Sequence, residues 1–354
     1  MSDSNDRAAV QVGLALSRGT RVANRLQNAA GEGARPPFVA GEGARPPVAM
    51  GEGARPPWAI RRLIVVALAV CLAPAAALAQ TPPKAFYSLN ADGTGWRKLF
   101  QLEGYPACGS PAVSPDGKEF AFDAWQMAGN QQQGPAKLFV VGLDGANARE
   151  LCPGQMPTWS PDGKFLVCSR SAEPSGLWIV TAEGKDHKLV APAWGAQWSP
   201  DGKRIAYYSG PRILTYEVES GETRQVLSGD NHGYRQVFWN MTWSPDSSQI
   251  CFKAAKPDGT EEMALVDAGG DEFGFKVRWS GKGLWVDFAW HPRGDRLVMA
   301  IRRPETKRVQ LFEVDPDADD PPVLVAGQDE NLNHFGMNWT PDGEQLIVVS
   351  SAAQ

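Results

Sequence analysis

The five residues WSPDG occur at Trp159–Gly163 and again at Trp198–Gly202. Four looser copies keep the proline, and they read VSPDG from Val113, WSPDS from Trp243, WHPRG from Trp290 and WTPDG from Trp339. Successive prolines lie 46, 39, 45, 47 and 49 residues apart. A period in the forties, with the strand-like runs described next, indicates four-stranded propeller blades rather than a helical solenoid.

Each copy of the motif has the chemistry of a tight turn followed by a strand. Pro sets φ at the second position of a type I turn, Asp suits the third, and Gly accepts the left-handed conformation that follows. Runs such as KEFAFDA (118–124) and KRIAYYS (203–209) come next and are apolar on both faces. A strand buried on both sides is what radially packed blades require.

A second pattern supplies the outer half of each blade. Runs such as LFVVGLDGANARELC (138–152) combine a β-rich stretch, a Gly turn and a more polar stretch, as in a hairpin. The first hairpin, Phe86–Leu99, lacks inner strands, and the last repeat lacks outer ones. The sequence therefore predicts an all-β, six-bladed propeller with four antiparallel strands per blade, closed by pairing of the N- and C-terminal strands.

The WSPDGK strand with its VxxxDG hairpin resembles the TolB-type repeat, a relative of the WD repeat, over about residues 86–350. TolB proper is a periplasmic component of the Tol–Pal envelope system and uses its propeller to bind a peptidoglycan-associated lipoprotein. It also carries an α/β domain before the propeller. Because six residues separate Ala79 from Phe86, we expect a stand-alone propeller without that domain, and the sequence leaves membership of the Tol system open.

The first 79 residues have a different character. Three copies of GEGARPP lie within residues 31–60, and such Gly- and Pro-rich sequence cannot bury a core. Arg61, Arg62 and the apolar run that follows, ending in Ala-Leu-Ala at Ala79, are typical of a secretory signal. We expect residues 1–49 to be disordered or untranslated, with a start at Met50, residues 50–79 to be a signal peptide cleaved after Ala79, and 80–354 to be the propeller.

The charge distribution limits the partners of the propeller. Residues 1–62 carry a net charge of +4, whereas residues 80–354 carry −9. An acidic propeller is a poor match for nucleic acid or an anionic membrane. We expect a periplasmic or secreted monomer with an envelope protein or peptide as partner, and no stable membrane span after signal cleavage.

The two turn motifs are expected on one face of the ring, so the variable loops opposite form the candidate binding face. This face carries the loops that lead into the innermost strands and those between the second and third strands of each blade. The longest of the first kind are Gly229–Asn240 and Gly327–Asn338, and the longest of the second kind is Trp125–Lys137. Aromatic and Arg side chains are typical anchors of protein interfaces. The expected partner-binding residues are Asp230, Asn231, His232, Tyr234, Arg235, Trp285, Asp287, Asn331, Asn333, His334 and Phe335.

The same loops also offer an alternative, a metal-binding site. His232 and His334 are the two histidines expected on this face, and with Asp230, Asp287 and Asn333 they would suffice to bind a divalent metal. Oligogalacturonate lyases, which resemble this architecture, hold a metal with clustered propeller histidines. The favoured reading is no cofactor, because the two blades are not adjacent and polar loop residues usually make local hydrogen bonds.

Cysteine usage adds one further expectation. Cys168 and Cys251 fall on buried strands and are expected as free core thiols. Cys108 and Cys152 both precede inner strands of neighbouring blades on the same face, so in an oxidising compartment they are the candidate disulfide.

Taken together, the sequence favours a non-enzymatic propeller in the cell envelope that binds a protein or peptide. The alternative is an enzyme or sugar binder that uses the centre of the ring, such as a metal-dependent oligogalacturonate-lyase-like protein. The chain lacks a GxSxG nucleophile elbow, which argues against the peptidases that carry a propeller beside an α/β-hydrolase domain.

Overall fold

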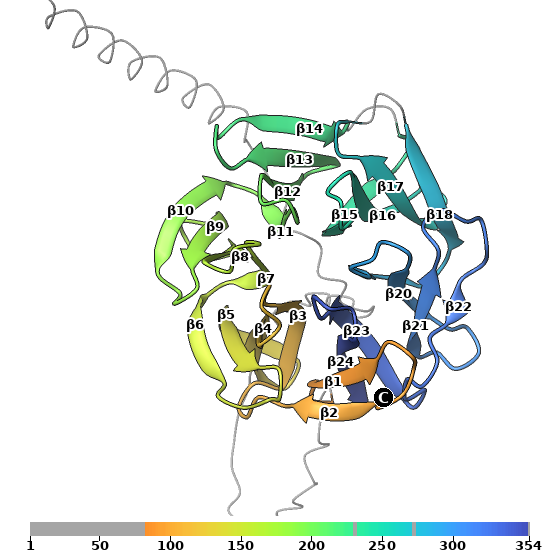
Figure 1. Ribbon diagram of the computed structural model, residues 1–354, viewed down its shortest axis with the longest axis horizontal. Helices are drawn as coiled ribbons and strands as arrows, with labels where there is room; N and C mark the ends of the chain where they lie inside the picture. Colours follow the sequence, from red (N-terminus) through yellow and green to blue (C-terminus); the bar gives the residue numbers. More distant parts are fainter. Residues whose placement is uncertain (1–81, 229–231, 271–273, 353–354) are drawn as a thin grey trace, which may run out of the picture. The chain divides into compact units, whose positions relative to one another are not determined.

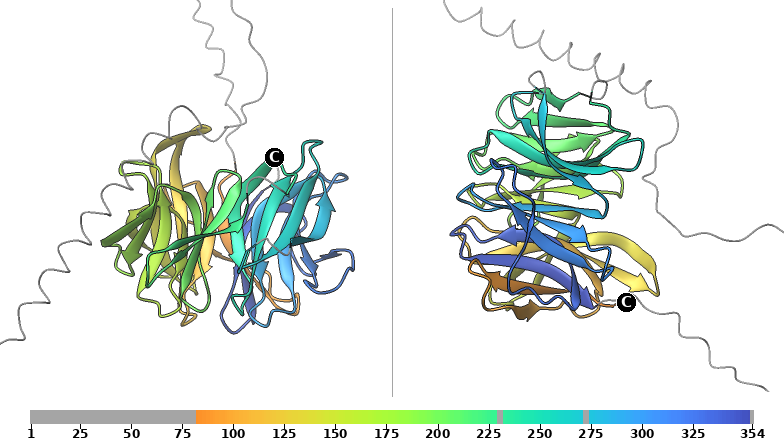
Figure 2. Two further views of the ribbon diagram at one scale, coloured as in Figure 1. Left: turned by 90° about the horizontal axis from the view of Figure 1, so that it is seen from above. Right: turned by 90° about the vertical axis from the view of Figure 1, so that its right-hand side faces the viewer.

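The computed structural model describes residues 82–228, 232–270 and 274–352, and the regular elements in these ranges are all β-strands. The strands form six four-stranded antiparallel sheets around a common centre (Figure 1). Views turned by 90° show the sheets standing side by side as blades (Figure 2). The predicted six-bladed propeller with four antiparallel strands per blade is confirmed.

Five blades are built from consecutive strands, and we number the blades 1–6 in chain order of their innermost strands. Blade 1 contains β3 (Ala107–Val113), β4 (Glu119–Ala128), β5 (Gln131–Gly142) and β6 (Arg149–Pro153). Blade 2 contains β7 (Gln155–Trp159), β8 (Phe165–Arg170), β9 (Gly176–Thr181) and β10 (Asp186–Ala191). Blade 3 contains β11 (Trp194–Trp198), β12 (Arg204–Ser209), β13 (Arg212–Glu217) and β14 (Thr223–Leu227).

The second half of the ring repeats this plan. Blade 4 contains β15 (Gln236–Trp243), β16 (Gln249–Ala255), β17 (Glu261–Asp267) and β18 (Phe275–Gly281). Blade 5 contains β19 (Leu284–Trp290), β20 (Leu297–Arg302), β21 (Val309–Val314) and β22 (Val323–Leu324). Within each of these five blades the first strand is innermost.

Blade 6 is shared between the two ends of the chain, as the sequence predicted. Its inner strands are β23 (Leu332–Trp339) and β24 (Gln345–Ala352), and its outer strands are β1 (Ala85–Asn90) and β2 (Arg97–Phe100). The β1 strand pairs antiparallel with β24 from Ala85 opposite Ser350 to Asn90 opposite Gln345. This pairing gives the ring no free edge at the junction of its ends.

The SPDG motif forms the turn between the first two strands of each blade. In blade 2 the Ser160 hydroxyl donates to Asp162 at 2.7 Å and accepts the Phe165 N–H at 3.0 Å. The Gly163 N–H donates to the Ser160 carbonyl, and Gly163 has a φ of +70°. This SPDG turn thus satisfies its Ser and Asp side chains internally, and it is the turn that the sequence predicted. The blade 5 copy differs, because His291 replaces the Ser and its Nε2 lies 3.2 Å from the Gly343 carbonyl of blade 6.

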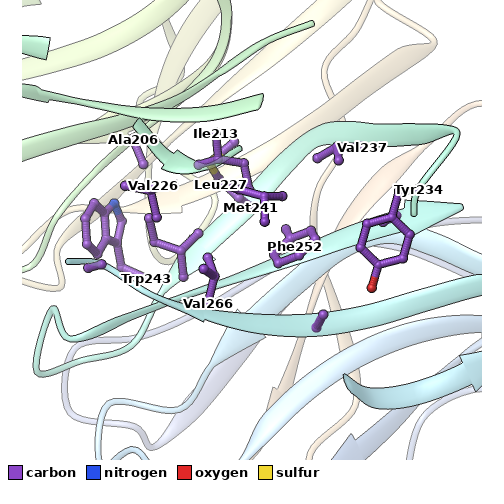
Figure 3. Close-up of a cluster of buried hydrophobic side chains, with 14 residues drawn as sticks. Ala206, Ile213, Val226, Leu227, Tyr234, Val237, Met241, Trp243, Phe252 and Val266 are labelled. Atoms are coloured by element: carbon purple, nitrogen blue, oxygen red, sulfur yellow. The ribbon is translucent and has the colours of Figure 1, made fainter. Parts of the chain in front are cut away.

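The recurring tryptophan packs between blades. Trp243 is 5% exposed and donates its indole N–H across to the Gln197 carbonyl of blade 3 at 3.0 Å. Figure 3 shows it in a core that also contains Val226 and Val266. Trp159, Trp198 and Trp339 are similarly buried, at 8% each. These four tryptophans belong to the core between blades, and Trp290 is half-buried against the core of blades 4 and 5.

One expected loop is a strand extension instead. Residues 125–137 were expected as a long loop, but β4 and β5 continue pairing through Gln126 opposite Gln133 to Ala128 opposite Gln131. A tight turn at Gly129, with a φ of +59°, connects the two strands. Pairing of the Gln-rich run satisfies backbone groups that a loop would leave to solvent.

The expected extension, signal peptide and cleavage site after Ala79 lie in residues 1–81, outside the described part of the chain. Within residues 82–228, 232–270 and 274–352 there is no helix that is long and apolar enough to cross a membrane.

Candidate functional site

A central cavity of about 400 Å³ is lined by the innermost strands of all six blades. At one end its wall includes motif residues such as Pro115 and Pro161. At the other end it includes Ser110, Met156, Asn240, Asp287 and Gly336, one from each of five blades and each three residues before the motif's first position. We call this second end the mouth of the central cavity.

The mouth is shaped by a register break in each innermost strand. Pairing skips two residues between Gly109 and Ala112, and it skips two in blades 2, 3 and 6 as well. In blades 4 and 5 it skips three, between Val237 and Met241 and between Leu284 and Phe288. Ser110 and Met156, which lie within such breaks, have positive φ values of 47° and 52°. Bulges re-aim side chains and are common beside binding sites, so here they turn a ring of residues toward the cavity.

Polar contacts connect neighbouring blades beside the cavity. The Asn338 side-chain oxygen of blade 6 accepts the Val113 N–H of blade 1 at 2.9 Å. The Ser169 hydroxyl of blade 2 accepts the Gly195 N–H of blade 3 at 3.0 Å. These bonds hold the bulged strands in place.

Asp123, on β4, is a buried carboxylate behind the mouth. One of its oxygens accepts the Met156 N–H of blade 2 at 2.8 Å, while Oδ1 has no hydrogen-bond partner among the described residues. Burial raises the pKa of Asp123 to about 6, although the Met156 N–H, the charge of Lys84 and the nearby Ser110 hydroxyl act to lower it. The nearby Asp287 charge raises it further.

Asp287, on β19, lies half-buried in the cavity wall. Its Oδ1 accepts the Asn240 amide N–H of blade 4 at 2.6 Å, which leaves the Asn240 Oδ1 atom buried without a partner. Burial raises the pKa of Asp287, and the amide of Asn240 and the charges of Lys84 and Lys253 oppose this. The mouth thus presents the Asp287 carboxylate and the Asn240 Oδ1 atom, which has no donor among the described residues.

Aromatic and cationic side chains surround these acceptors. Trp285 and Phe335 are half-buried with ring centroids 5.2 Å apart, and the Lys84 ammonium lies 4.5 Å from the Phe335 centroid. Lys253 is 4.4 Å from the Phe238 centroid, and it also pairs with Glu261 at 2.6 Å. Half-buried aromatic rings beside hydrogen-bonding groups form the kind of surface that anchors a partner.

The predicted loop residues divide into exposed and structural ones. Arg235 and Asn331 are exposed, and the Asn331 side-chain oxygen accepts a 3.3 Å hydrogen bond from Arg308. Asn333 accepts the Val309 N–H at 2.9 Å and so joins blade 5 to blade 6. Asp230 and Asn231 lie outside the described residues.

Tyr234 was expected as an aromatic anchor, but the structure buries it. It is 9% exposed and lies beside Phe252 in the core (Figure 3). It also packs against Phe275 and donates its hydroxyl proton to Glu262 at 2.8 Å. Burial is the main reason that its pKa is raised. The ring completes the core of blade 4, so it is not available for contact with a partner.

The two histidines of the metal hypothesis belong to separate local networks. His334 is fully buried, with Nδ1 2.8 Å from the Ser350 hydroxyl and Nε2 3.0 Å from the Asp329 carbonyl. His232 lies 3.3 Å from the Pro211 carbonyl and accepts the Tyr234 N–H at 3.1 Å. Within the described ranges, no three His, Cys, Asp or Glu side chains are grouped so that they could hold a metal ion.

The cysteines also differ from expectation. Cys108 and Cys152 are both free, and Cys108 packs in the core around Phe86 and Phe122. Cys152 instead shares a core with Cys168 of blade 2. The expected pairing of Cys108 with Cys152 is therefore wrong for this structure, because the two side chains enter different interblade cores.

Comparison with solved structures gives the architecture a context. A chain assigned as TolB from Agrobacterium tumefaciens superposes with a TM-score of 0.61 at 19% identity, over 77% of this chain and 100% of that one. The fold is that of a TolB-like propeller. TolB from Acinetobacter baumannii gives 0.52 at 16% identity, over 76% of this chain and 64% of its own. At these identities the likeness establishes the fold.

Other comparisons set the limits of this likeness. A GH74 enzyme from Niastella koreensis superposes at a TM-score of 0.54 and 13% identity, over 77% of this chain and 49% of that one. No protein-family model and no curated protein matches the sequence. Structural similarity thus extends both to TolB and to part of a GH74 enzyme, and the fold does not by itself assign a function.

Sequence reasoning named Trp285, Asp287 and Phe335 of this TolB-like propeller but missed Asp123, Asn240 and the two lysines. A signal for Asp123 and Lys253 was present: each is a charged residue in an otherwise apolar strand, at the same position of its repeat. Asn240 could have been found by aligning the residue three places before the motif in each blade. Lys84 precedes the repeats, so no internal alignment would reveal it.

Proposed function

We propose that this propeller is a non-enzymatic platform that binds a protein or peptide at the mouth of its central cavity. The single observation that carries the proposal is the half-buried Trp285–Phe335 pair beside Asp287 and Asn240. Aromatic anchors next to unsatisfied acceptors favour a partner segment that inserts an apolar group together with a hydrogen-bond donor.

The chemistry of the acceptors indicates which donor fits. Asp287 is a carboxylate, and Asn240 contributes a carbonyl oxygen that has no donor of its own. An ammonium or guanidinium group would satisfy both kinds of oxygen and could also rest against the aromatic rings. We infer that the inserted segment carries a Lys or Arg side chain, which competes with Lys84 for this position.

The exposed residues Arg235 and Asn331 would extend the contact beyond the mouth. Tyr234, His232, Asn333 and His334 would contribute by holding the loops in place. We also propose a location in the cell envelope as a monomer, on the basis of the signal-like sequence ending at Ala79 and the resemblance to TolB. That resemblance and the aromatic mouth are what support a protein partner.

The test is capture followed by titration. Tagged residues 80–354 are crosslinked in the envelope fraction of the native host, and the dominant captured protein is purified and titrated against variants. Trp285→Ala and Asp287→Asn should each weaken binding at least tenfold, corresponding to about 1.4 kcal/mol. Lys164→Ala, on the exposed motif turn of blade 2, is the matched control and should leave affinity unchanged.

The opposite results would reject the proposal. If all three variants bind the captured protein equally, the mouth is not the contact surface. If the wild type instead binds acidic oligosaccharides with stoichiometric metal, and His232→Ala with His334→Ala removes that metal, the lyase-like alternative replaces the platform.

A further inference from the structure

Cys152 and Cys168 meet at the interface between blades 1 and 2. Cys152 lies on β6, Cys168 lies on β8, and both belong to the core that includes Leu138 and Val140. The two thiols face the same interblade core, and each influences the pKa of the other. A Cβ atom on Gly154 would lie 3.0 Å from the Cys168 sulfur, so glycine at this position allows the sulfur to approach the backbone next to Cys152.

A fixed cation lies beside the pair. The Arg170 guanidinium donates to the Pro153 carbonyl at 3.0 Å and to Asp186 at 2.7 Å, and it lies 4.8 Å from the Trp178 ring. Its side chain is 12% exposed. Three partners therefore hold a positive charge next to two thiols, an arrangement that favours a thiolate.

The two thiols are not equivalent. Cys152 is 7% exposed and Cys168 is fully buried. The neighbouring Cys168 thiol, followed by the charge of Arg170, lowers the pKa of Cys152 against the opposing effects of burial and Asp186. The Cys152 thiol and burial raise the pKa of Cys168. Cys152 thus has the character of an attacking thiol, and Cys168 that of the resolving thiol.

We propose that Cys152 and Cys168 are a redox-active pair that closes to a disulfide and cross-links blades 1 and 2 when a disulfide oxidant reaches the protein. The Cys152 thiolate attacks one sulfur of the oxidant, the oxidant's S–S bond breaks, and its other sulfur leaves as a thiolate. That thiolate takes the Cys168 proton, and the Cys168 thiolate then attacks the Cys152 sulfur and releases the second oxidant sulfur as a thiolate, which takes up the proton that Cys152 lost on ionising. Two protein thiols are oxidised and one oxidant disulfide is reduced.

The remaining described cysteines serve as internal controls. Cys251 is fully buried in a separate core with Met263 and Leu265, and burial raises its pKa. Cys108 is fully buried around Phe86, and burial raises its pKa to about 12. Neither shares a hydrophobic core with another cysteine, so both should stay reduced under mild oxidation.

Peptide mapping tests the proposal directly. The propeller, residues 80–354, is incubated with oxidised glutathione, blocked with N-ethylmaleimide and digested with trypsin without reduction. Cleavage after Lys164 separates peptide 150–164, which contains Cys152, from peptide 165–170, which contains Cys168. The expected product is these two peptides joined by a disulfide, with Cys108 and Cys251 alkylated. Fully alkylated Cys152 and Cys168, or a Cys108–Cys152 linkage, would overturn the proposal.

A stability measurement separates the cross-link from simple packing. Oxidation should raise the unfolding midpoint of the wild type by about 5 °C, because a short closed loop restricts the unfolded chain. In Cys152→Ser the midpoint should be the same before and after oxidation, whatever its absolute value, whereas Cys251→Ser should keep the oxidation-dependent shift. A shift that survives in Cys152→Ser would reject the pair as its source.

Discussion

The two ends of the central cavity are built on opposite principles. At the motif end, Ser160, Asp162 and Gly163 satisfy one another through hydrogen bonds inside a single turn. At the mouth, the Asn240 Oδ1 atom has no donor among the described residues, and the same holds for Oδ1 of Asp123 buried behind it. The motif end is repeated almost without change, while the mouth differs from blade to blade.

The motif turns stabilise the ring, whereas the mouth offers groups that a partner could bind. A self-satisfied turn gains nothing from a partner, since its polar groups already have their hydrogen bonds. A buried acceptor without a donor is a standing cost that a suitable ligand can relieve. Binding is therefore expected at the mouth, and truncation of a side chain should cost more stability at the motif end than at the mouth.

The largest expected effect comes from removing a motif tryptophan. Trp243→Ala should lower the free energy of unfolding by about 3–5 kcal/mol, because a buried indole leaves a cavity and the Gln197 carbonyl loses its donor. Trp285→Ala at the mouth should cost less than half as much, since that ring is half-buried. Guanidinium-induced unfolding measures both, and equal losses would contradict the comparison.

Acidification should lower the stability of the fold through the buried His334. The Asp329 carbonyl accepts from Nε2 of His334, so Nδ1 accepts from the Ser350 hydroxyl and the ring is neutral. Burial lowers the pKa of His334 to about 4 from the usual 6.5. The histidine of the unfolded chain binds a proton at a higher pH than the buried one does. The contribution of neutral His334 to the free energy of unfolding is therefore fully present above pH 6.5 and falls by about 3 kcal/mol as the pH drops to 4.

Thermal unfolding across this range provides the check. His334→Gln should be less stable at pH 7 but should lose less on acidification than the wild type. His187→Gln on exposed β10 should keep the wild-type pH slope. An unchanged slope in His334→Gln would show that another group controls the acid response.

The smallest expected effect is a gain in stability. Burial raises the pKa of Asp123 to about 6, so the stability associated with its protonated form is present below pH 4 and is lost as the pH rises through 6. Asp123→Asn keeps an acceptor for the Met156 N–H and removes the buried charge. Its free energy of unfolding should exceed that of the wild type by about 2 kcal/mol at pH 7.5.

The gain should shrink toward zero near pH 4, and Glu222→Gln at an exposed turn should change nothing at either pH. Chemical denaturation at the two pH values measures these differences. A loss of stability at pH 7.5 would mean that the Asp123 charge is better compensated than its contacts indicate.

The repeat made the fold predictable, because turn chemistry and two-sided apolar strands are local properties of the chain. Tyr234 was expected as an exposed anchor but is buried. The composition of a loop indicates that the loop is polar, but it does not show that one aromatic ring is buried and donates to Glu262. Cys152 was assigned to the correct neighbourhood of the ring, yet its thiol turns toward blade 2 rather than toward Cys108. Depth and direction depend on contacts between blades, which one repeat does not encode.

The mouth was predictable only in part for the same reason. Asp287 and Trp285 stand out in the sequence, but their relation to Asn240 and Phe335 depends on register breaks in several innermost strands. Pairing across strands sets such breaks. A charged residue inside an apolar strand, such as Asp123, is the signal to look for in similar chains.

The shared construction of blade 6 makes the order of synthesis matter. The β1 strand is made first, yet its partner β24 is the last strand to be made, so a growing chain carries an unpaired hairpin through the whole of its synthesis. During that interval the edge of β1 is open to proteases and to other chains. The final residues of β24 therefore decide when the protein passes from a vulnerable to a protected state, and a chaperone that shields β1 and β2 would be of most use just before they arrive.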